Sequence, residues 1–239
     1  MFEQFLNTDV SFFSVEVIPI ILVVILLEAI LSADNAVALA AIIRSLPDPN
    51  QEKWALRYGV IGALALRVIL IFAATWVMKY WQFELAGSLY LLWLSGKFFL
   101  EKSKEGHDAK RPVRMANKLW QVVLLVSFTD LAFSIDSVTV SIAVAQETWL
   151  VLIGGVVGII SLRFLAGLFI KKLEEFTHLE SAGYFTVLLV GLRLLLKVFS
   201  DSLVPPEWLM ITCIALIFLW GFSKRELSDA SEASADRNN

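Results

Sequence analysis

Seven blocks of apolar residues constrain the fold of this chain more strongly than any other feature of its sequence. Most of the blocks have close to the ~20 residues that an α-helix needs to cross the hydrocarbon core of a bilayer. Hydrophobic residues make up 58% of the 239 residues, and they occur in continuous runs instead of the alternation typical of a membrane β-barrel. The sequence therefore predicts an all-α polytopic membrane protein with seven transmembrane helices. We expect these helices at residues 17–43, 58–78, 84–100, 119–144, 149–170, 182–199 and 208–222.

Basic residues indicate how these helices are oriented. The loops after the first, third and fifth blocks and the C-terminal tail hold most of the lysines and arginines, whereas the loops on the other side hold only Lys79 and Lys197. Positively charged loops stay in the cytoplasm. The N-terminus is therefore predicted to lie outside and the C-terminus in the cytoplasm. Residues 224–239, rich in serine, alanine and acidic residues, are expected to form a disordered cytoplasmic tail.

An acidic motif occurs twice, once in the first block and once in the fourth. The first copy consists of Glu28, Ser32, Asp34 and Asn35. The second copy has the same spacing and consists of Asp130, Ser134, Asp136 and Ser137. Ionisable side chains inside a bilayer are energetically costly, so they indicate a functional site. The duplication predicts a site shared by two halves of a transporter.

The similarity between the two halves extends beyond the acidic motif. The second and fifth blocks share a pattern of glycines and an arginine, and the third and sixth blocks both begin with Ala-Gly. The corresponding residues are Gly59, Gly62 and Arg67 against Gly155, Gly158 and Arg163, and Gly87 against Gly183. Three spans per repeat is an odd number, so the halves must cross the membrane in opposite directions. We therefore predict a 3+3 inverted repeat in a single transmembrane domain, residues 1–223. Repeat one covers about residues 17–100, repeat two about 119–199, and the extra helix about 208–222.

The side chains of the acidic motif offer only oxygen ligands. Mn²⁺, Mg²⁺ and Ca²⁺ prefer oxygen, whereas Cu⁺ and Zn²⁺ prefer sulfur or imidazole. We expect four acids to bind the cation directly, namely Glu28, Asp34, Asp130 and Asp136. Secondary oxygens are expected from Asn35, Ser32, Ser134 and Ser137. Neighbouring carboxylates disfavour one another's ionised form, so one of them could exchange its cation for a proton.

The six-residue spacing of the two acids in each copy raises a geometric question. Positions six apart in an ideal helix point roughly 120° apart, so both acids of one copy cannot face the same ion. Two interpretations stay open. Either each span serves two layers of site, or it is locally unwound around residues 32–34 and 134–136, as broken helices in transporters are.

Basic residues inside the apolar blocks have two interpretations. Arg67 and Arg163 occupy corresponding positions near the middle of the membrane. They are expected to balance the acids in structural ion pairs, or to gate the site by releasing the acids when the ion arrives. Lys97 and Arg193 lie nearer to helix ends, and we expect their charged groups to extend to the membrane surface.

At these motifs the chain resembles the TerC/Alx family of integral membrane proteins. The resemblance rests on Glu28-Ala-Ile-Leu-Ser-Ala-Asp-Asn35 and on Ser127-Phe-Thr-Asp-Leu-Ala-Phe-Ser-Ile-Asp-Ser137, and it covers about residues 15–225. It implies membership of the LysE-type exporter superfamily, an association with tellurium resistance, and export of Mn²⁺. The motif positions that match the family are Glu28, Asp34, Asn35, Asp130 and Asp136.

The predicted function is a secondary transporter in the plasma membrane, or alternatively a thylakoid membrane, that exports Mn²⁺ from the cytoplasm. Ca²⁺ and Mg²⁺ are less favoured as the transported ion. The chain has no P-loop, so an ion gradient or the membrane potential must drive transport. No enzymatic activity and no nucleic-acid partner are expected, and the sequence does not indicate the oligomeric state. Two alternatives stay open: a Ca²⁺/H⁺ exchanger, and a membrane scaffold or tellurium-resistance-associated protein whose acids pair structurally with Arg67 and Arg163.

Overall fold

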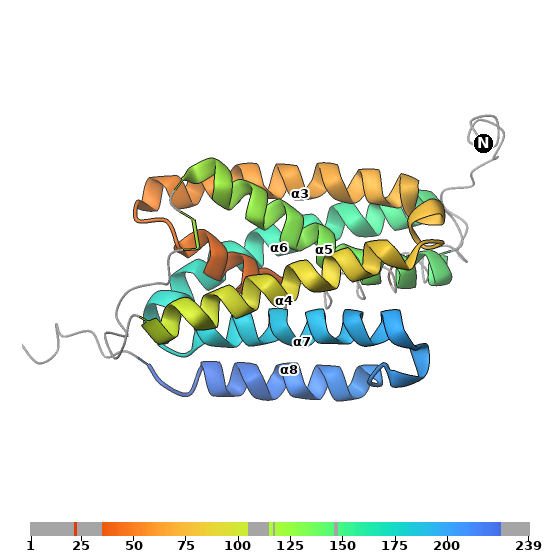
Figure 1. Ribbon diagram of the computed structural model, residues 1–239. Helices are drawn as coiled ribbons and strands as arrows, with labels where there is room; N and C mark the ends of the chain where they lie inside the picture. The colour runs from red at the N-terminus through yellow and green to blue at the C-terminus, as the bar shows by residue number, and fades with distance from the viewer. Residues whose placement is uncertain (1–21, 23–34, 105–114, 117, 146–147, 226–239) are drawn as a thin grey trace, which may run out of the picture.

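The computed structural model describes residues 22, 35–104, 115–116, 118–145 and 148–225 (Figure 1). In this part of the chain the regular elements are helices, apart from an isolated antiparallel bridge between Phe176 and Arg225. A helical segment, Asn35–Arg44, comes first. The helices that follow are α3 (Pro49–Val77), α4 (Trp81–Lys104), α5 (Leu119–Ala145), α6 (Thr148–Glu175), α7 (Leu179–Phe199), the 3-10 helix η1 (Asp201–Leu203) and α8 (Glu207–Gly221). The predicted all-α class is confirmed.

Several helices extend beyond the apolar blocks that predicted them. α3 begins at Pro49 instead of residue 58, and α6 ends at Glu175 instead of residue 170. The Asp48 carboxylate starts α3 by accepting a hydrogen bond from the backbone N–H of Asn50 at 2.9 Å, and proline suits the first helical position. Hydropathy marks only the part of a helix that lies in lipid, so it misses polar turns at the ends.

The surface of the bundle is apolar along most of its length. Four stretches are long and apolar enough to cross a membrane: α3, residues Leu119–Thr139 of α5, residues Trp149–Glu175 of α6, and α7. The side chains of Phe164, Phe199 and Leu219 are 74%, 73% and 70% exposed. An apolar surface of this kind suits lipid and is unusual on a soluble monomer.

The helical segment Asn35–Arg44 occupies the centre of the bundle. Its residues from Asn35 to Ile43 are buried, and those from Ala36 to Ile43 are apolar and at most 1% exposed. A helix that is apolar on every side can lie in lipid or in a protein core, and here neighbouring helices cover it. Apart from Leu22, this segment is the only part of the first predicted span within the described residues.

α3 and α5 run parallel and approach each other closely at two glycines. Gly59 faces Val126 and Gly62 faces Ser127, so both helices advance in the same direction. A Cβ atom added at Gly62 would overlap the Ser127 hydroxyl oxygen, so one of the two helices or the serine would have to shift. This close approach brings the following turn of α3 against α5.

Two other helix pairs run antiparallel, α4 with α7 and α3 with α6. In the first pair Leu91 contacts Gly191, and the rings of Phe98 and Tyr184 stack with centroids 3.8 Å apart. In the second pair the contacts are Leu56 with Gly167 and Ile71 with Gly155. α8 packs against α7 on the outside of the bundle (Figure 1).

Candidate functional site

The second copy of the acidic motif lies entirely on α5. Asp130 and Ser134 are fully buried, Ser137 is buried, and Asp136 is 22% exposed. Of the first copy, Asn35 is buried at the start of the central helical segment. The other three residues of that copy, Glu28, Ser32 and Asp34, lie outside the described residues.

α5 is continuous through the motif, so local unwinding around residues 134–136 does not occur in this helix. The Ser134 hydroxyl donates to the Asp130 carbonyl at 2.7 Å, one helical turn earlier. Asp130 and Asp136 are six residues apart, which places them ~9 Å apart along the helix and on different faces. They therefore form two layers. We call them the Asp130 layer (Asp130, Arg67 and Ser134) and the Asp136 layer (Asp136, Arg193, Lys197 and Glu84).

The Asp130 layer is a buried ion pair between α3 and α5. Nη2 of Arg67 lies 3.2 Å from Oδ1 of Asp130, and the two side chains are 1% and 0% exposed. The Ser134 hydroxyl lies 3.4 Å from the other carboxylate oxygen of Asp130. Removing one partner of such a pair strands a bare charge in a medium that cannot solvate it.

The neighbouring contacts explain why Arg67 meets Asp130. The Ser127 hydroxyl, one turn before Asp130, donates to the Val123 carbonyl at 2.8 Å and lies 3.3 Å from the Gly59 carbonyl. This fixes the register of α3 against α5. Gly155 of α6 packs beside the stem of Arg67, because a Cβ atom there would lie at the ordinary contact distance of 3.5 Å from Cδ of the arginine.

The Asp136 layer joins three helices through four charged groups. Nη1 of Arg193 on α7 lies 2.5 Å from Oδ2 of Asp136. Nζ of Lys197, also on α7, lies 3.2 Å from Oδ1 of Asp136 and 3.1 Å from Oε1 of Glu84 on α4. All four side chains are between 20% and 22% exposed, so this layer is less buried than the Asp130 layer.

The structure places two basic residues differently from the sequence-based expectation. Arg193 was expected to extend its charge to the membrane surface, and this is wrong, because its guanidinium turns inward to Asp136. Arg163 is exposed on α6, and no ion pair joins it to an acid among the described residues. Arg67 and Arg163 therefore differ in surroundings although they correspond in sequence. The motif residue that corresponds to Asp130 in the first half is Glu28, which is outside the described residues.

Sequence reasoning gave no role to Glu84 or Lys197, because both lie near the ends of predicted spans. One signal was present: Arg193 and Lys197 are four residues apart, so they share one face of an otherwise apolar helix. Two basic residues on one face of a membrane helix require acidic partners inside the protein.

Among the side chains that the structure describes, the formal charges of each layer balance. One acid faces one base in the Asp130 layer, and two acids face two bases in the Asp136 layer. Among the described residues, no three His, Cys, Asp or Glu side chains come together as a metal site. A cation that bound to the described carboxylates of either layer would compete with a basic side chain already in contact with them.

Comparison with known proteins identifies one family. The profile described as "Integral membrane protein TerC family" matches residues 13–228. The Bacillus subtilis membrane protein YceF is 37% identical over a region covering 71% of this chain and 68% of that relative. YkoY of the same organism is 31% identical over a region covering 84% of this chain and 68% of YkoY. Alx of Salmonella typhi is named as a candidate membrane-bound redox modulator. It is 27% identical over a region covering 72% of this chain and 62% of Alx. No solved structure matches the chain.

Proposed function

Since this chain belongs to the TerC family of integral membrane proteins, we propose that it is a secondary transporter that exports Mn²⁺, or a similar hard divalent cation, from the cytoplasm. The observation that carries the proposal is the fully buried Asp130 carboxylate, held by Arg67 and Ser134 on a helix that bears a second charged layer. Buried acids of this kind are typical of ion pathways through membranes.

The proposed architecture has seven spans, with the N-terminus outside, arranged as two inverted three-helix repeats plus α8. Two features of the packing support it. A two-fold axis in the membrane plane relates α3 to α6 and α4 to α7, and helices related by such an axis run antiparallel. The residue contacts within both pairs show that the two helices of each pair run antiparallel. The central position of Asn35–Arg44 suits a helix at the interface between the repeats.

The proposed mechanism exchanges basic side chains for the transported cation. A divalent ion entering from the cytoplasm displaces Arg67 from Asp130 and then moves outward to Asp136. Asn35 and Ser134 supply further oxygen ligands, together with Glu28 and Asp34 of the first copy. The repeats rock about the midplane to give access to each side in turn. A proton that replaces the cation on a carboxylate couples transport to the pH gradient.

The redox role in the name of the Alx relative is not favoured for this chain. Thiol–disulfide exchange within one chain needs two cysteines, and the sequence has only Cys213. Cys213 lies half-buried on α8, which packs against α7 on the outside of the bundle.

Flux through proteoliposomes tests the proposal. Purified protein is reconstituted with an imposed pH gradient, and the fluxes of Mn²⁺, Ca²⁺ and Mg²⁺ are compared. We expect Asp136→Asn to abolish Mn²⁺ flux and to leave the protein folded and inserted. Glu174→Gln is the matched control, because it removes an exposed carboxylate at the end of α6, and it should transport at the wild-type rate.

Three outcomes separate the proposal from its alternatives. Wild-type flux in Asp136→Asn would contradict it. A large loss of thermal stability in Asp136→Asn with no flux of any cation in the wild type would favour a scaffold. Faster flux of Ca²⁺ than of Mn²⁺ would identify a Ca²⁺/H⁺ exchanger, because oxygen ligands alone do not separate these ions.

A further inference from the structure

Lys197 is held by carboxylates from two different helices. Its ammonium nitrogen lies 3.1 Å from a carboxylate oxygen of Glu84 and 3.2 Å from one of Asp136. Carboxylates from two helices, α4 and α5, thus converge on a single positive charge. A hard divalent cation is bound by the same arrangement, oxygens from more than one carboxylate around one point.

Lys197 is also able to leave this position. It lies in the last turn of α7, which ends at Phe199, and a lysine carries its charge on a flexible four-carbon stem. Near a helix end such a side chain can carry its ammonium to the surface while the stem stays on the protein. A cavity of about 10 Å³, the room of about one water molecule, borders Glu84 and Thr139.

The charges of the Asp136 layer make Lys197 and a cation mutually exclusive. With Lys197 in place, Glu84 and Asp136 are balanced by Lys197 and Arg193. When Lys197 withdraws, the two acids and Arg193 leave a single negative charge that attracts a cation. A divalent cation beside an undisplaced Lys197 would instead place excess positive charge in a half-buried site, which is costly.

We propose that Lys197 is a built-in competing cation that displaces the transported ion from Glu84 and Asp136 and so promotes its release at the outer end of the bundle. Glu84 is then the second carboxylate of the exit position. The inference rests on the proposed function, because it assigns the last step of export to the Asp136 layer. Arg193 keeps Asp136 oriented throughout.

Equilibrium binding of Mn²⁺ tests the competition directly. The free ion is measured by electron paramagnetic resonance in solutions of the purified full chain. If Lys197 occupies the carboxylates about nine-tenths of the time, Lys197→Met should tighten the apparent affinity about tenfold. Lys197→Gln should act in the same way. Lys197→Arg retains a positive charge and should stay near the wild type.

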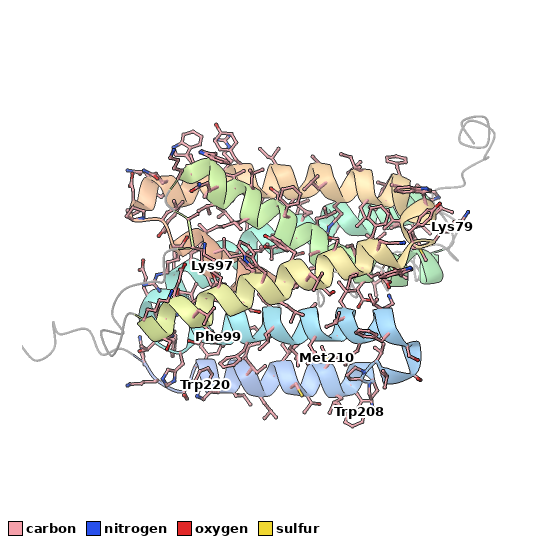
Figure 2. All side chains as sticks on the ribbon, in the orientation of Figure 1. Lys79, Lys97, Phe99, Trp208, Met210 and Trp220 are labelled. Carbon is pink, nitrogen blue, oxygen red and sulfur yellow. The ribbon has the colours of Figure 1, made fainter. Side chains whose placement is uncertain are left out.

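Two controls separate competition from a general effect of charge. Lys79→Met removes a lysine from the same end of the bundle (Figure 2), and no ion pair is made by Lys79 among the described residues. It should leave the affinity unchanged. Adding Glu84→Gln to Lys197→Met should abolish the gain, because the exit position then loses one of its two carboxylates. In flux assays, Lys197→Met should lower both the half-saturating Mn²⁺ concentration and the maximal rate.

The outcomes that overturn the inference are specific. Unchanged or weaker Mn²⁺ binding in both Lys197→Met and Lys197→Gln would reject it, and so would an equal gain in Lys79→Met. If the wild type transports divalent cations but neither Lys197 variant binds Mn²⁺ more tightly, this inference is rejected and the proposed function stands. A gain in affinity with no transport by the wild type would reject the proposed function and leave Lys197 as a competitor for cation binding.

Discussion

Asp130 and Arg67 are buried together at a depth where neither charge can reach water. Charged groups pay a large desolvation cost in such a place, and the cost is offset only while the partner is present. The Asp136 layer is partly exposed, so the exchange of one of its charges for another costs less. Replacing Arg67 at Asp130 therefore requires another cation to take its place at once, whereas the charges of the Asp136 layer exchange more readily.

We expect Arg67→Met to destabilise the protein by about 3–5 kcal/mol, because it leaves the Asp130 carboxylate buried without a counter-charge. Thermal unfolding in detergent measures the loss. The double variant Arg67→Met/Asp130→Leu should recover most of it, since both charges are then absent. Arg163→Met removes the corresponding arginine from an exposed position on α6 and should have little effect. Equal stability of the two arginine variants would contradict the assigned burial.

At the scale of elements, the register between α3 and α5 decides which charges meet. Gly62 lets α3 approach the Ser127 side of α5, and Arg67 then lies opposite Asp130. Tyr90 of α4 adds a second contact to α5, because its hydroxyl lies 3.0 Å from the Thr129 hydroxyl and 3.1 Å from the Leu125 carbonyl. α5 is thus held by hydrogen bonds from two neighbouring helices.

Gly62→Ala should cost about 1–3 kcal/mol, because the added methyl group overlaps the Ser127 hydroxyl and pushes the helices apart. Gly96→Ala is the matched control, since no atom lies within 4 Å of a Cβ at that position of α4. Chemical or thermal unfolding compares the two. Combining Gly62→Ala with Ser127→Ala should restore part of the loss. A loss of equal size in Gly96→Ala would contradict a packing origin, because helix propensity alone favours alanine over glycine.

At the scale of the whole molecule, the two ends of the bundle differ in their residues. The short connection between α3 and α4 carries Lys79 at the end where α7 finishes. At the other end, the Thr177 backbone N–H donates to the Lys224 carbonyl beside the start of α7, and the rings of His178 and Trp220 stack with centroids 4.8 Å apart. The Asp136 layer lies toward the Lys79 end, because Lys197 is in the last turn of α7.

Single cysteines should react from opposite sides of the membrane. In a Cys213→Ser background, Lys79→Cys should react with a membrane-impermeant maleimide on intact cells, and Lys224→Cys should react only after permeabilisation. Both positions are exposed, and they lie near opposite ends of α7. That helix has 21 residues and is therefore ~32 Å long. Labelling of Lys224→Cys on intact cells would reverse the predicted orientation and with it the assignment of the exit end.

The helix ends were predicted accurately where the apolar run ends with the helix, and inaccurately where the helix continues into polar residues. α5, predicted at residues 119–144, is observed at Leu119–Ala145, because its apolar run and its helix end together. The start of α3 was misplaced, because Asp48 and Pro49 begin the helix in a polar segment that hydropathy does not register. The question of unwinding in the motif stayed open, because spacing describes an ideal helix and cannot report whether the helix continues.

The sequence by itself determined the helical class, the approximate positions of most helices, and the acids of the second motif that carry the proposed function. These depend on hydropathy, periodicity and the cost of burying charge, all of which are local. Only the tertiary structure decided the partners: Arg67 for Asp130, and Arg193 and Lys197 with Glu84 for Asp136. Periodicity places a residue on a face of its own helix, but the rotation of neighbouring helices decides what that face meets. Close packing at Gly62 and Gly191 sets that rotation.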